Sequence, residues 1–235
     1  MIKLSLVYPY YNNPRCLERQ LELWTHLPPE IGRQVEYVLI DDGSPEPAVI
    51  RPNGPVNITL ARIKGDKPWN QHGARNLGMK LAESDWAIAS DIDHVLPAEG
   101  LALVLGMVKD PGSVYYFARR REDGTPRHPH PNSFLIERRA FWAAGGYDEN
   151  FCGHYGKGDL FLRLLFSRAL RLVELEQPAL VELDNAATPG LIRQTRHNRW
   201  LAKMKRWQLR RSKYKNGQTL RFEWEIVHRW RTGPD

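Results

Sequence analysis

The chain has 235 residues, 42% of them hydrophobic, and a formal net charge of +7 at pH 7. This length and hydrophobic content suit one α/β domain with a sizeable core and exclude a second full domain. The apolar runs are shorter than a bilayer span, no secretory leader is visible, and two cysteines are too few for a disulfide scaffold. We therefore expect a cytoplasmic protein rather than a membrane-spanning or disulfide-stabilised one.

The first forty residues predict a βαβ unit. Residues 2–8 are an apolar run typical of a strand, and a loop rich in Pro and Asn follows at residues 9–14. Residues 16–24 carry apolar side chains at helical spacing, and residues 35–40 form a second strand-like run. Strand, turn, helix and strand begin a βαβ unit. The second strand delivers two carboxylates, Asp41 and Asp42, into the turn that follows it.

Two further aspartates follow the next predicted strand. A helix expected to begin at residue 73 leads into the apolar run at residues 86–90, and Asp91 and Asp93 come directly after that run. Alternate side chains of an extended chain point the same way, so both carboxylates should converge at a strand end, where open α/β sheets bind ligands. Mg²⁺ and Mn²⁺ prefer oxygen ligands and leave positions for phosphate oxygens. The pair therefore predicts a divalent metal site beside a phosphorylated ligand.

The order and spacing of four segments resemble the family 2 glycosyltransferases, nucleotide-sugar enzymes with the GT-A fold. The segments are Tyr8-Pro9-Tyr10-Tyr11-Asn12, Asp41-Asp42-Gly43-Ser44, Ala74-Arg75-Asn76-Leu77-Gly78 and Asp91-Ile92-Asp93. A fifth match ends in Gly158-Asp159, where the family usually has Glu-Asp. The resemblance covers about residues 1–170. It implies an α/β fold with a single Rossmann-like GT-A domain, whose central, mostly parallel sheet is flanked by helices.

The resemblance also implies which residues perform the chemistry. Asp93 would contact Mn²⁺ or Mg²⁺ directly, and Asp91 would contact the metal through water or bind a ribose hydroxyl. Asp159 is the only carboxylate left at the expected position of the catalytic base. Several GT-A enzymes complete the metal shell with a histidine after the last core strand, which favours His197. Other histidines near these motifs, such as His94, are expected to be solvated or structural.

A UDP-sugar is the expected donor. Pro9 and Tyr11 belong to the loop after the first strand, where Tyr11 could cover the base. Asp41 and Asp42 would hold the nucleoside, because a carboxylate accepts hydrogen bonds from the uracil imide or from ribose hydroxyls. Arg75 would contact uracil or pyrophosphate; a surface salt bridge is the alternative on spacing alone.

The carboxyl-terminal segment differs from the rest in charge. Residues 190–231 contain thirteen Lys or Arg and two Glu, a net charge of +11, and four of the eight tryptophans. We divide the chain into a nucleotide-sugar transferase domain, residues 1–189, and a basic, Trp-rich, helical extension packed on it, residues 190–235. One face of the predicted helix carries Leu191, Thr195, Trp200, Met204 and Trp207, so we expect that face to pack on the core. The charge favours a polyanionic partner, with nucleic acid preferred over an anionic membrane surface.

Three functions fit these observations. The first is a metal-dependent, inverting transferase that moves a sugar to a hydroxyl acceptor, for instance a modified base in DNA. The second is a peripheral-membrane transferase of bacterial surface polysaccharide synthesis, whose tail lies on an anionic membrane to reach a lipid-linked acceptor. The third is a nucleotide-sugar or nucleic-acid binding protein that has lost catalysis, motivated by Gly158. Asp91, Asp93 and Asp159 argue against the third.

Overall fold

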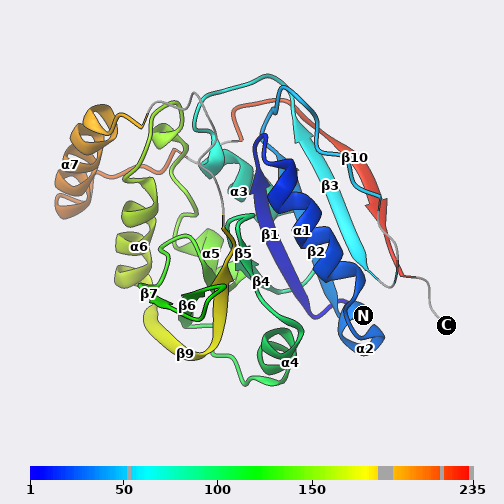
Figure 1. The fold of residues 1–235 in the computed structure, drawn as a ribbon. Helices are drawn as coiled ribbons and strands as arrows, with labels where there is room; N and C mark the ends of the chain where they lie inside the picture. Colours follow the sequence, from blue (N-terminus) through cyan, green and yellow to red (C-terminus); the bar gives the residue numbers. More distant parts are fainter. Residues whose placement is uncertain (52–53, 55, 185–192, 218–219, 233–235) are drawn as a thin grey trace.

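The computed structural model describes residues 1–51, 54, 56–184, 193–217 and 220–232. Within these residues, one ten-stranded sheet carries helices on both faces (Figure 1). The strands are β1 (Leu4–Tyr10), β2 (Val35–Asp41), β3 (Asn57–Ile63), β4 (Trp86–Ala89), β5 (His94–Val95), β6 (Ser113–Arg121), β7 (Pro126–Arg127), β8 (Phe134–Glu137), β9 (Arg171–Glu182) and β10 (Trp224–Trp230). The helices are α1 (Pro14–Thr25), α2 (Pro29–Gly32), α3 (Gln71–Leu81), α4 (Ala98–Gly106), α5 (Arg138–Ala143), α6 (Gly158–Ala169) and α7 (Arg196–Arg210), with a 3₁₀ turn at Glu149–Phe151.

The strand order is β10-β3-β2-β1-β4-β8-β6-β9-β5, and β7 pairs with β6. Strands β3, β2, β1 and β4 run parallel, as do β6 and β9. The remaining pairings are antiparallel, so the sheet is mixed, and the expected parallel arrangement describes its β3–β4 half. The predicted α/β architecture, a central sheet flanked by helices, is confirmed.

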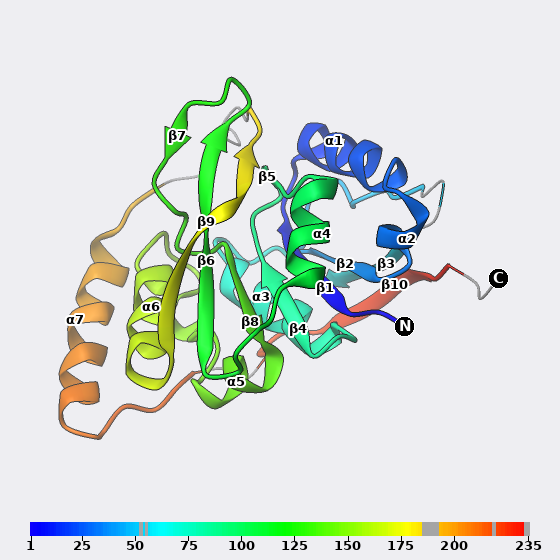
Figure 2. The same ribbon diagram turned by 90° about the horizontal axis from the view of Figure 1, so that it is seen from below.

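The sheet is buried on both faces because its strands alternate apolar side chains between two cores. On β1, Leu4, Leu6 and Tyr8 belong to the core beneath α1, α2 and α4, whereas Val7 belongs to the core beneath α3, α5 and α6 (Figure 2). Helix α3 lies so close to β1 that a Cβ atom at Gly78 would collide with the Val7 side chain. That close packing fixes the beginning of α3 next to the ends of the parallel strands.

The carboxyl-terminal segment is both helix and strand. Helix α7 was expected, but β10, which pairs antiparallel with β3 at the edge of the sheet, was not. Just beyond β10, Arg231 lies 2.7 Å from a carboxylate oxygen of Glu36, which is fully buried on β2. The end of the described chain therefore adds an edge strand to the sheet. The domain boundary placed between residues 189 and 190 stays a prediction.

Only part of the predicted inward face of α7 packs on the domain: Met204 lies against a core cluster that contains Phe161 and Leu165. Trp200 and Trp207 are 62% and 49% exposed, and the residues that α7 buries are Asn198, Leu201, Ala202 and Lys205. Leu191, the first member of the predicted face, lies outside the described residues. No helix in the described part of the chain combines the length and apolarity that crossing a membrane requires.

Candidate functional site

The carboxyl ends of β1, β2 and β4 meet at one edge of the sheet, because these strands are parallel neighbours. The loops that follow them, together with the loop before α3, surround a cavity of about 240 Å³, which we call the strand-end cavity. The predicted site residues Pro9, Tyr11, Asp42, Asp91 and Asp93 all line it. The other lining residues are Tyr10, Asn13, Lys67, Pro68, Trp69, Gln71, Ile92 and Arg193.

The two aspartates after β2 have different surroundings. Asp41 does not line the cavity; its Oδ1 accepts a hydrogen bond from the Ser44 amide at 2.9 Å. Its Oδ2 accepts from the Ala48 amide and from Arg62, both at 2.9 Å. Because the protein itself satisfies both oxygens, Asp41 holds the turn that follows β2. The nucleoside contact predicted for Asp41 is not supported by this placement.

Asp42 faces the cavity and is only 5% exposed. Asn70 donates a hydrogen bond of 2.7 Å to its Oδ1. Burial raises the pKa of Asp42 to about 8, and the neighbouring Asp41 carboxylate adds to the rise, while the bond from Asn70 opposes it. The carboxyl group therefore changes its protonation state close to neutral pH.

Arg75 positions Asp91. Its side chain is fully buried, does not line the cavity and forms an ion pair with Asp91 Oδ1. His130 lies against the other oxygen of Asp91, with Nδ1 3.2 Å from Oδ2. Burial raises the pKa of Asp91, but Arg75, His130 and His94 outweigh burial and lower it to about 2. Asp91 is thus ionised at neutral pH, and the contact of Arg75 with a donor that the sequence predicted is replaced by a contact with Asp91.

A group that could hold a metal ion lies at one end of the cavity. Within the described residues it consists of Asp91, Asp93 and His94, whose ligand atoms lie within 4.8 Å of one another. His94 Nδ1 is buried, lies 2.8 Å from Asp93 Oδ1 and makes no aligned hydrogen bond. Two ligands of one octahedral ion, each bonded at about 2.1 Å, are about 3 Å apart, so this spacing fits a shared cation. Two carboxylates and an imidazole suit Mn²⁺.

The other side of the His94 ring constrains how it can act. Nε2 lies 3.1 Å from a guanidinium nitrogen of Arg119, which is always a donor. While Arg119 donates to Nε2, the proton of a neutral His94 lies on Nδ1. If Nδ1 binds a metal ion, the ring proton moves to Nε2, and Arg119 can then no longer donate to Nε2. Arg119 would have to turn toward Glu182, whose Oε1 is 3.5 Å away.

His197, the predicted metal ligand, does not belong to this group. It is exposed at the beginning of α7 and stacks on His154 with ring centroids 3.9 Å apart. The histidine that joins the two aspartates in this group is His94, which directly follows Asp93 in the sequence. Its position directly after Asp93 is the sequence feature by which His94 could have been predicted as a ligand.

Asp159 lies in the first turn of α6 and follows Lys157, a residue in the left-handed conformation with φ of 71°. Its Oδ1 is buried, and no hydrogen-bond partner reaches it within the described chain. Its negative charge raises the pKa of Arg75 and of Tyr147, which places it beside the group around Asp91. A buried carboxylate oxygen without a partner can accept a hydrogen bond from a ligand.

The space next to Gly158 is filled by His72. A Cβ atom at Gly158 would collide with the imidazole ring of His72, which is 3% exposed and stacks on Tyr147 at an interplanar angle of 11°. Burial, together with the nearby Arg75, lowers the pKa of His72 to about 3, so its ring is neutral.

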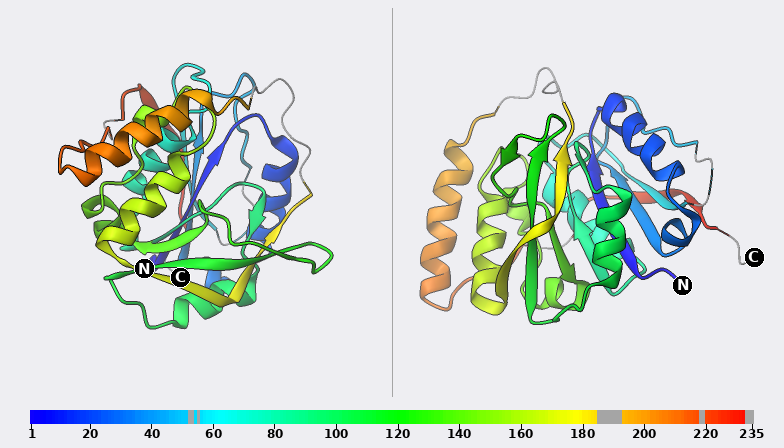
Figure 3. Two further views of the ribbon diagram at one scale, coloured as in Figure 1. Left: turned by 90° about the vertical axis from the view of Figure 1, so that its left-hand side faces the viewer. Right: turned by 60° about the horizontal axis from the view of Figure 1, so that its bottom comes forward.

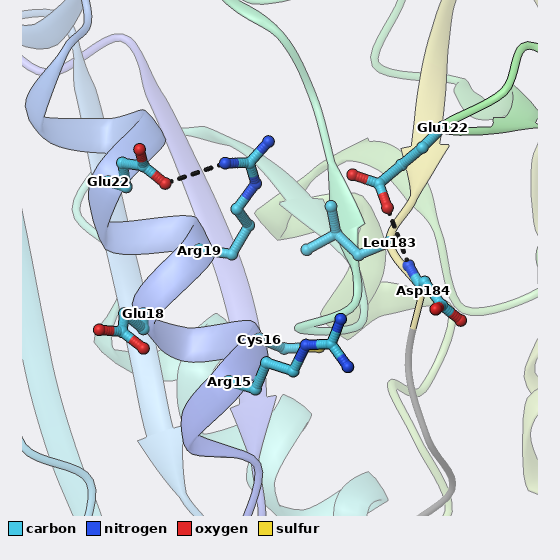
Figure 4. A pocket seen from close by; sticks show the side chains of 8 residues that line it. All are labelled: Arg15, Cys16, Glu18, Arg19, Glu22, Glu122, Leu183 and Asp184. Atoms are coloured by element: carbon cyan, nitrogen blue, oxygen red, sulfur yellow. Dashed lines mark hydrogen bonds and ion pairs between the residues drawn. The ribbon is translucent and has the colours of Figure 1, made fainter.

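A groove continues from the strand-end cavity at Asp93. Its first part, of about 480 Å³, is lined by Asp93, Arg121, Glu122, Asp123, Glu182, Leu183 and Asp184. Its second part shares Glu122, Leu183 and Asp184 and runs between α1 and the end of β9, with a volume of about 510 Å³ (Figure 4). In Figure 4 the α1 side chains Arg15, Arg19 and Glu22 face Glu122 and Asp184 across the groove. Five carboxylates and one arginine line the first part, so it is strongly acidic.

Besides His94, which lies next to the cavity lining, three cavity residues with charged or large aromatic side chains were not predicted: Lys67, Trp69 and Arg193. Lys67 and Trp69 lie in the loop before α3, where a cation and an aromatic residue at a strand end were a usable signal. Trp69 contacts Tyr155 at a centroid distance of 4.6 Å, and Arg193 lies over the same tyrosine ring at 5.7 Å. Nothing in its sequence context distinguishes Arg193 from the other cations of the segment.

Comparisons with known proteins find a matching sequence family, a related sequence and similar folds. The model of the family "Glycosyl transferase family 2" matches residues 5–160, a stretch that contains every predicted site residue except His197. The chain is 30% identical over 130 residues to the undecaprenyl-phosphate 4-deoxy-4-formamido-L-arabinose transferase of Proteus mirabilis. That match covers 52% of this chain and 38% of the relative, so the chain spans well under half of it.

Two solved structures show the same fold. TarS residues 1–349 of S. aureus, in complex with UDP-GlcNAc, superposes with a TM-score of 0.62 at 14% identity, over 80% of this chain and 60% of that one. A mannosyltransferase of Pyrobaculum calidifontis, in complex with GDP-Man and Mn²⁺, superposes with a TM-score of 0.56 at 15% identity, over 89% and 61%.

Proposed function

Because the chain belongs to glycosyl transferase family 2, we propose that it transfers a sugar from a nucleotide-sugar donor to a saccharide hydroxyl, with a divalent cation as cofactor. The observation that carries the proposal is a continuous surface: the strand-end cavity, the group around Asp93 and the acidic groove adjoin one another. A donor, a metal and an acceptor can therefore meet at Asp93.

The strand-end cavity would hold the donor. Asp42 lines this cavity and, when ionised, would accept the imide N–H of uracil, which favours a UDP-sugar; Tyr11 or Trp69 would cover the base or the sugar. Lys67 and Arg193 bring positive charge to the same cavity, where they would neutralise a diphosphate. Tyr11 is held in place by its hydroxyl, which donates to Asp66 at 2.9 Å.

Mn²⁺ or Mg²⁺ would be held by Asp93 and Asp91, with His94 as the third ligand once Arg119 leaves Nε2. A bound cation would neutralise the negative charge that develops on the leaving diphosphate. Arg75 keeps the Asp91 carboxylate ionised and oriented toward the cavity. A solved structure of the same fold, the Pyrobaculum calidifontis mannosyltransferase, is in complex with GDP-Man and Mn²⁺, which supports a divalent cation as cofactor.

Asp159 would remove the proton of the attacking hydroxyl. Its Oδ1 is buried without a partner and is therefore ready to accept that hydrogen bond. A single base that activates the acceptor is the chemistry of an inverting transfer, in which the hydroxyl attacks the face opposite the leaving group. Asp159, with its buried Oδ1, and Asp91, which Arg75 orients, favour an active enzyme over an inactive binding protein.

The acceptor class follows from the charge of the groove. DNA, the first choice from the sequence, is a polyanion, and the five carboxylates of the groove would repel it. Carboxylates accept hydrogen bonds from sugar hydroxyls, so the groove suits a saccharide. The Proteus mirabilis relative is an undecaprenyl-phosphate transferase by name. We therefore place a lipid-linked saccharide first among acceptors, as in surface polysaccharide synthesis; a cytoplasmic location stays a prediction.

Release of nucleoside diphosphate tests the proposal. Panels of UDP- and GDP-sugars are incubated with Mn²⁺ or Mg²⁺ and with a saccharide, a polyprenyl-phosphate-linked saccharide or hydroxymethylated DNA. We expect metal-dependent UDP release that the saccharide acceptors accelerate. DNA as the only accelerating acceptor would overturn the acceptor assignment, and no metal-dependent release with any donor would overturn the function.

Asp93→Asn identifies the metal site. The change removes a charged oxygen ligand at nearly constant shape, so calorimetric titration with UDP and Mn²⁺ should show at least a tenfold loss of metal-dependent affinity. Asp85→Asn, an exposed aspartate just before β4, is the matched control and should bind as the unmodified protein does. Unchanged metal dependence in Asp93→Asn would remove Asp93 from the site.

A further inference from the structure

Helix α7 presents a fixed outer face. Two buried polar anchors set its rotation about its own axis. Asn198 donates hydrogen bonds to the carbonyls of Phe151 and His154, at 2.9 and 2.7 Å. Lys205 forms a buried ion pair with Asp148, whose Oδ2 is 2.5 Å from Nζ. These contacts hold one side of α7 against the domain, and the opposite side is left to solvent.

The outer face consists of Arg199, Trp200, Lys203, Arg206, Trp207 and Arg210, and all six side chains are exposed. At 100° per residue these positions fall within an arc of about 120°, so they share one surface. The two tryptophans are seven residues apart, or about 10 Å along the axis. No Asp or Glu occurs between residues 185 and 222, so no acidic side chain of this segment offsets the charge.

The position of α7 makes this face accessible to a flat partner. In Figure 2 and in the right-hand view of Figure 3, α7 is the outermost element, with α6 on its inner side and no other element beyond it. None of the cavities described above includes a residue of α7. A convex, basic surface with two exposed indoles suits a planar interface between water and lipid.

We propose that the outer face of α7 docks on a membrane surface of anionic lipids. Trp200 and Trp207 would insert at the headgroup level, and the four cations would contact lipid phosphates. A lipid surface fits better than single-stranded nucleic acid, which proteins hold in a positively charged groove, because none of the cavities described above includes a residue of α7.

Docking through α7 would also bring the proposed active site to the membrane. The carbonyls that accept the hydrogen bonds of Asn198 belong to the segment just before Asp159. In the same segment, a Cβ atom at Gly156 would lie 3.5 Å from the side chain of Thr195, the residue before α7. The relevance to catalysis rests on the proposed function, since a lipid-linked saccharide is met only at a membrane. The docking itself does not depend on catalysis.

Vesicle flotation with the full chain tests the inference. Vesicles of phosphatidylglycerol and phosphatidylcholine are compared with pure phosphatidylcholine vesicles at low and physiological salt. We expect binding to the anionic vesicles that weakens with salt. Lys203→Ser with Arg206→Ser should weaken it about 30-fold, since each basic residue near an anionic surface contributes about fivefold to tenfold. Trp200→Ser with Trp207→Ser should weaken it at least about tenfold.

Matched control variants separate binding through the outer face of α7 from a general loss of positive charge or of exposed apolar surface. Lys3→Ser with Arg51→Ser removes the same charge from exposed positions outside α7, and Leu103→Ser removes an exposed apolar side chain of α4. Both should bind as the unmodified protein does, and thermal unfolding of every variant checks its fold. UDP and Mn²⁺ titration without lipid should be unchanged in the α7 variants, which separates failure of docking from failure of the proposed function.

Three outcomes would overturn the inference. They are no binding of the unmodified protein to anionic vesicles at low salt, equal losses in the α7 and control variants, and tighter binding to a single-stranded oligonucleotide than to vesicles through the same residues. The last outcome would assign the face to nucleic acid.

Discussion

Asp42→Asn isolates the part that one carboxyl group plays in donor binding. Burial raises the pKa of Asp42 to about 8, so the ionised fraction is about 1% at pH 6, about half at pH 8 and about 90% at pH 9. If the carboxylate accepts the uracil imide N–H, apparent affinity follows that fraction. Affinity for UDP should then rise about 50-fold from pH 6 to pH 8 and less than twofold from pH 8 to pH 9.

The assay is titration of UDP between pH 6 and pH 9 with a chelator present, so that metal binding does not contribute. Asp42→Asn keeps an acceptor oxygen but cannot ionise, so it should lose this rise, while titration of the UDP phosphate affects both proteins equally. Identical pH dependence in both proteins would refute the reasoning. Affinity that falls as pH rises would instead show that protonated Asp42 donates to a carbonyl of the base.

The same pKa gives an independent readout in stability. Because the folded state raises the pKa of Asp42 from its ordinary 3.8, it binds more protons than the unfolded state between about pH 4 and pH 8. This contribution to the free energy of unfolding is complete at low pH and is lost as pH rises through about 8. Asp42→Asn should remove this slope, worth a few kcal/mol at pH 9, in denaturant titrations.

Two further substitutions test Asp159 as the catalytic base and the ion pair between Arg231 and Glu36. Asp159→Asn should lower turnover by on the order of a hundredfold or more and leave UDP affinity unchanged; near-normal turnover in steady-state assays would place the base elsewhere. Arg231→Met should lower the free energy of unfolding in urea by about 3 kcal/mol, because it strands the buried Glu36 carboxylate, and adding Glu36→Gln should recover most of the loss. A loss below about 1 kcal/mol would mean that the hydrogen bonds from Ser5, Thr59 and the Glu83 amide satisfy Glu36 without Arg231.

The sequence predicted the strand-end site because the parallel βαβ order brings the residues after β4 beside the turn that carries Asp42. The extended-chain alternation expected for Asp91 and Asp93 is wrong, because β4 ends at Ala89 and residues 91–93 form a turn, closed by a hydrogen bond from the His94 amide to the Asp91 carbonyl. What the sequence could not supply was the partner of each side chain. Arg75 and Asp41 match motif positions, yet ion pairing and turn hydrogen bonds direct them to the protein itself.

The orientation of α7 was harder to predict, because buried polar contacts rather than the apolar pattern decide which side of the helix faces the domain. Apolar patterning favoured burying Trp200 and Trp207, but Lys205 pairs with Asp148, which is distant in sequence, and thereby turns the tryptophans outward. Strand β10 was missed for a related reason. Its side chains are mostly exposed, so the run lacks the apolar pattern of a strand, and its hydrogen bonds to β3 are what create it.

The glycine at position 158, where the family usually has glutamate, and the buried imidazole of His72 depend on each other. A side chain at position 158 would need the space that the His72 ring occupies, so the chain can hold one of the two but not both. The imidazole that fills this space is buried and neutral, and it stacks on Tyr147. The beginning of α6 therefore keeps one carboxylate, Asp159, without a second negative charge beside it. A second carboxylate at position 158 would repel the Asp159 carboxylate, and the glycine removes that repulsion. The glycine is thus compatible with catalysis through Asp159, which is why we place an active enzyme before an inactive binding protein.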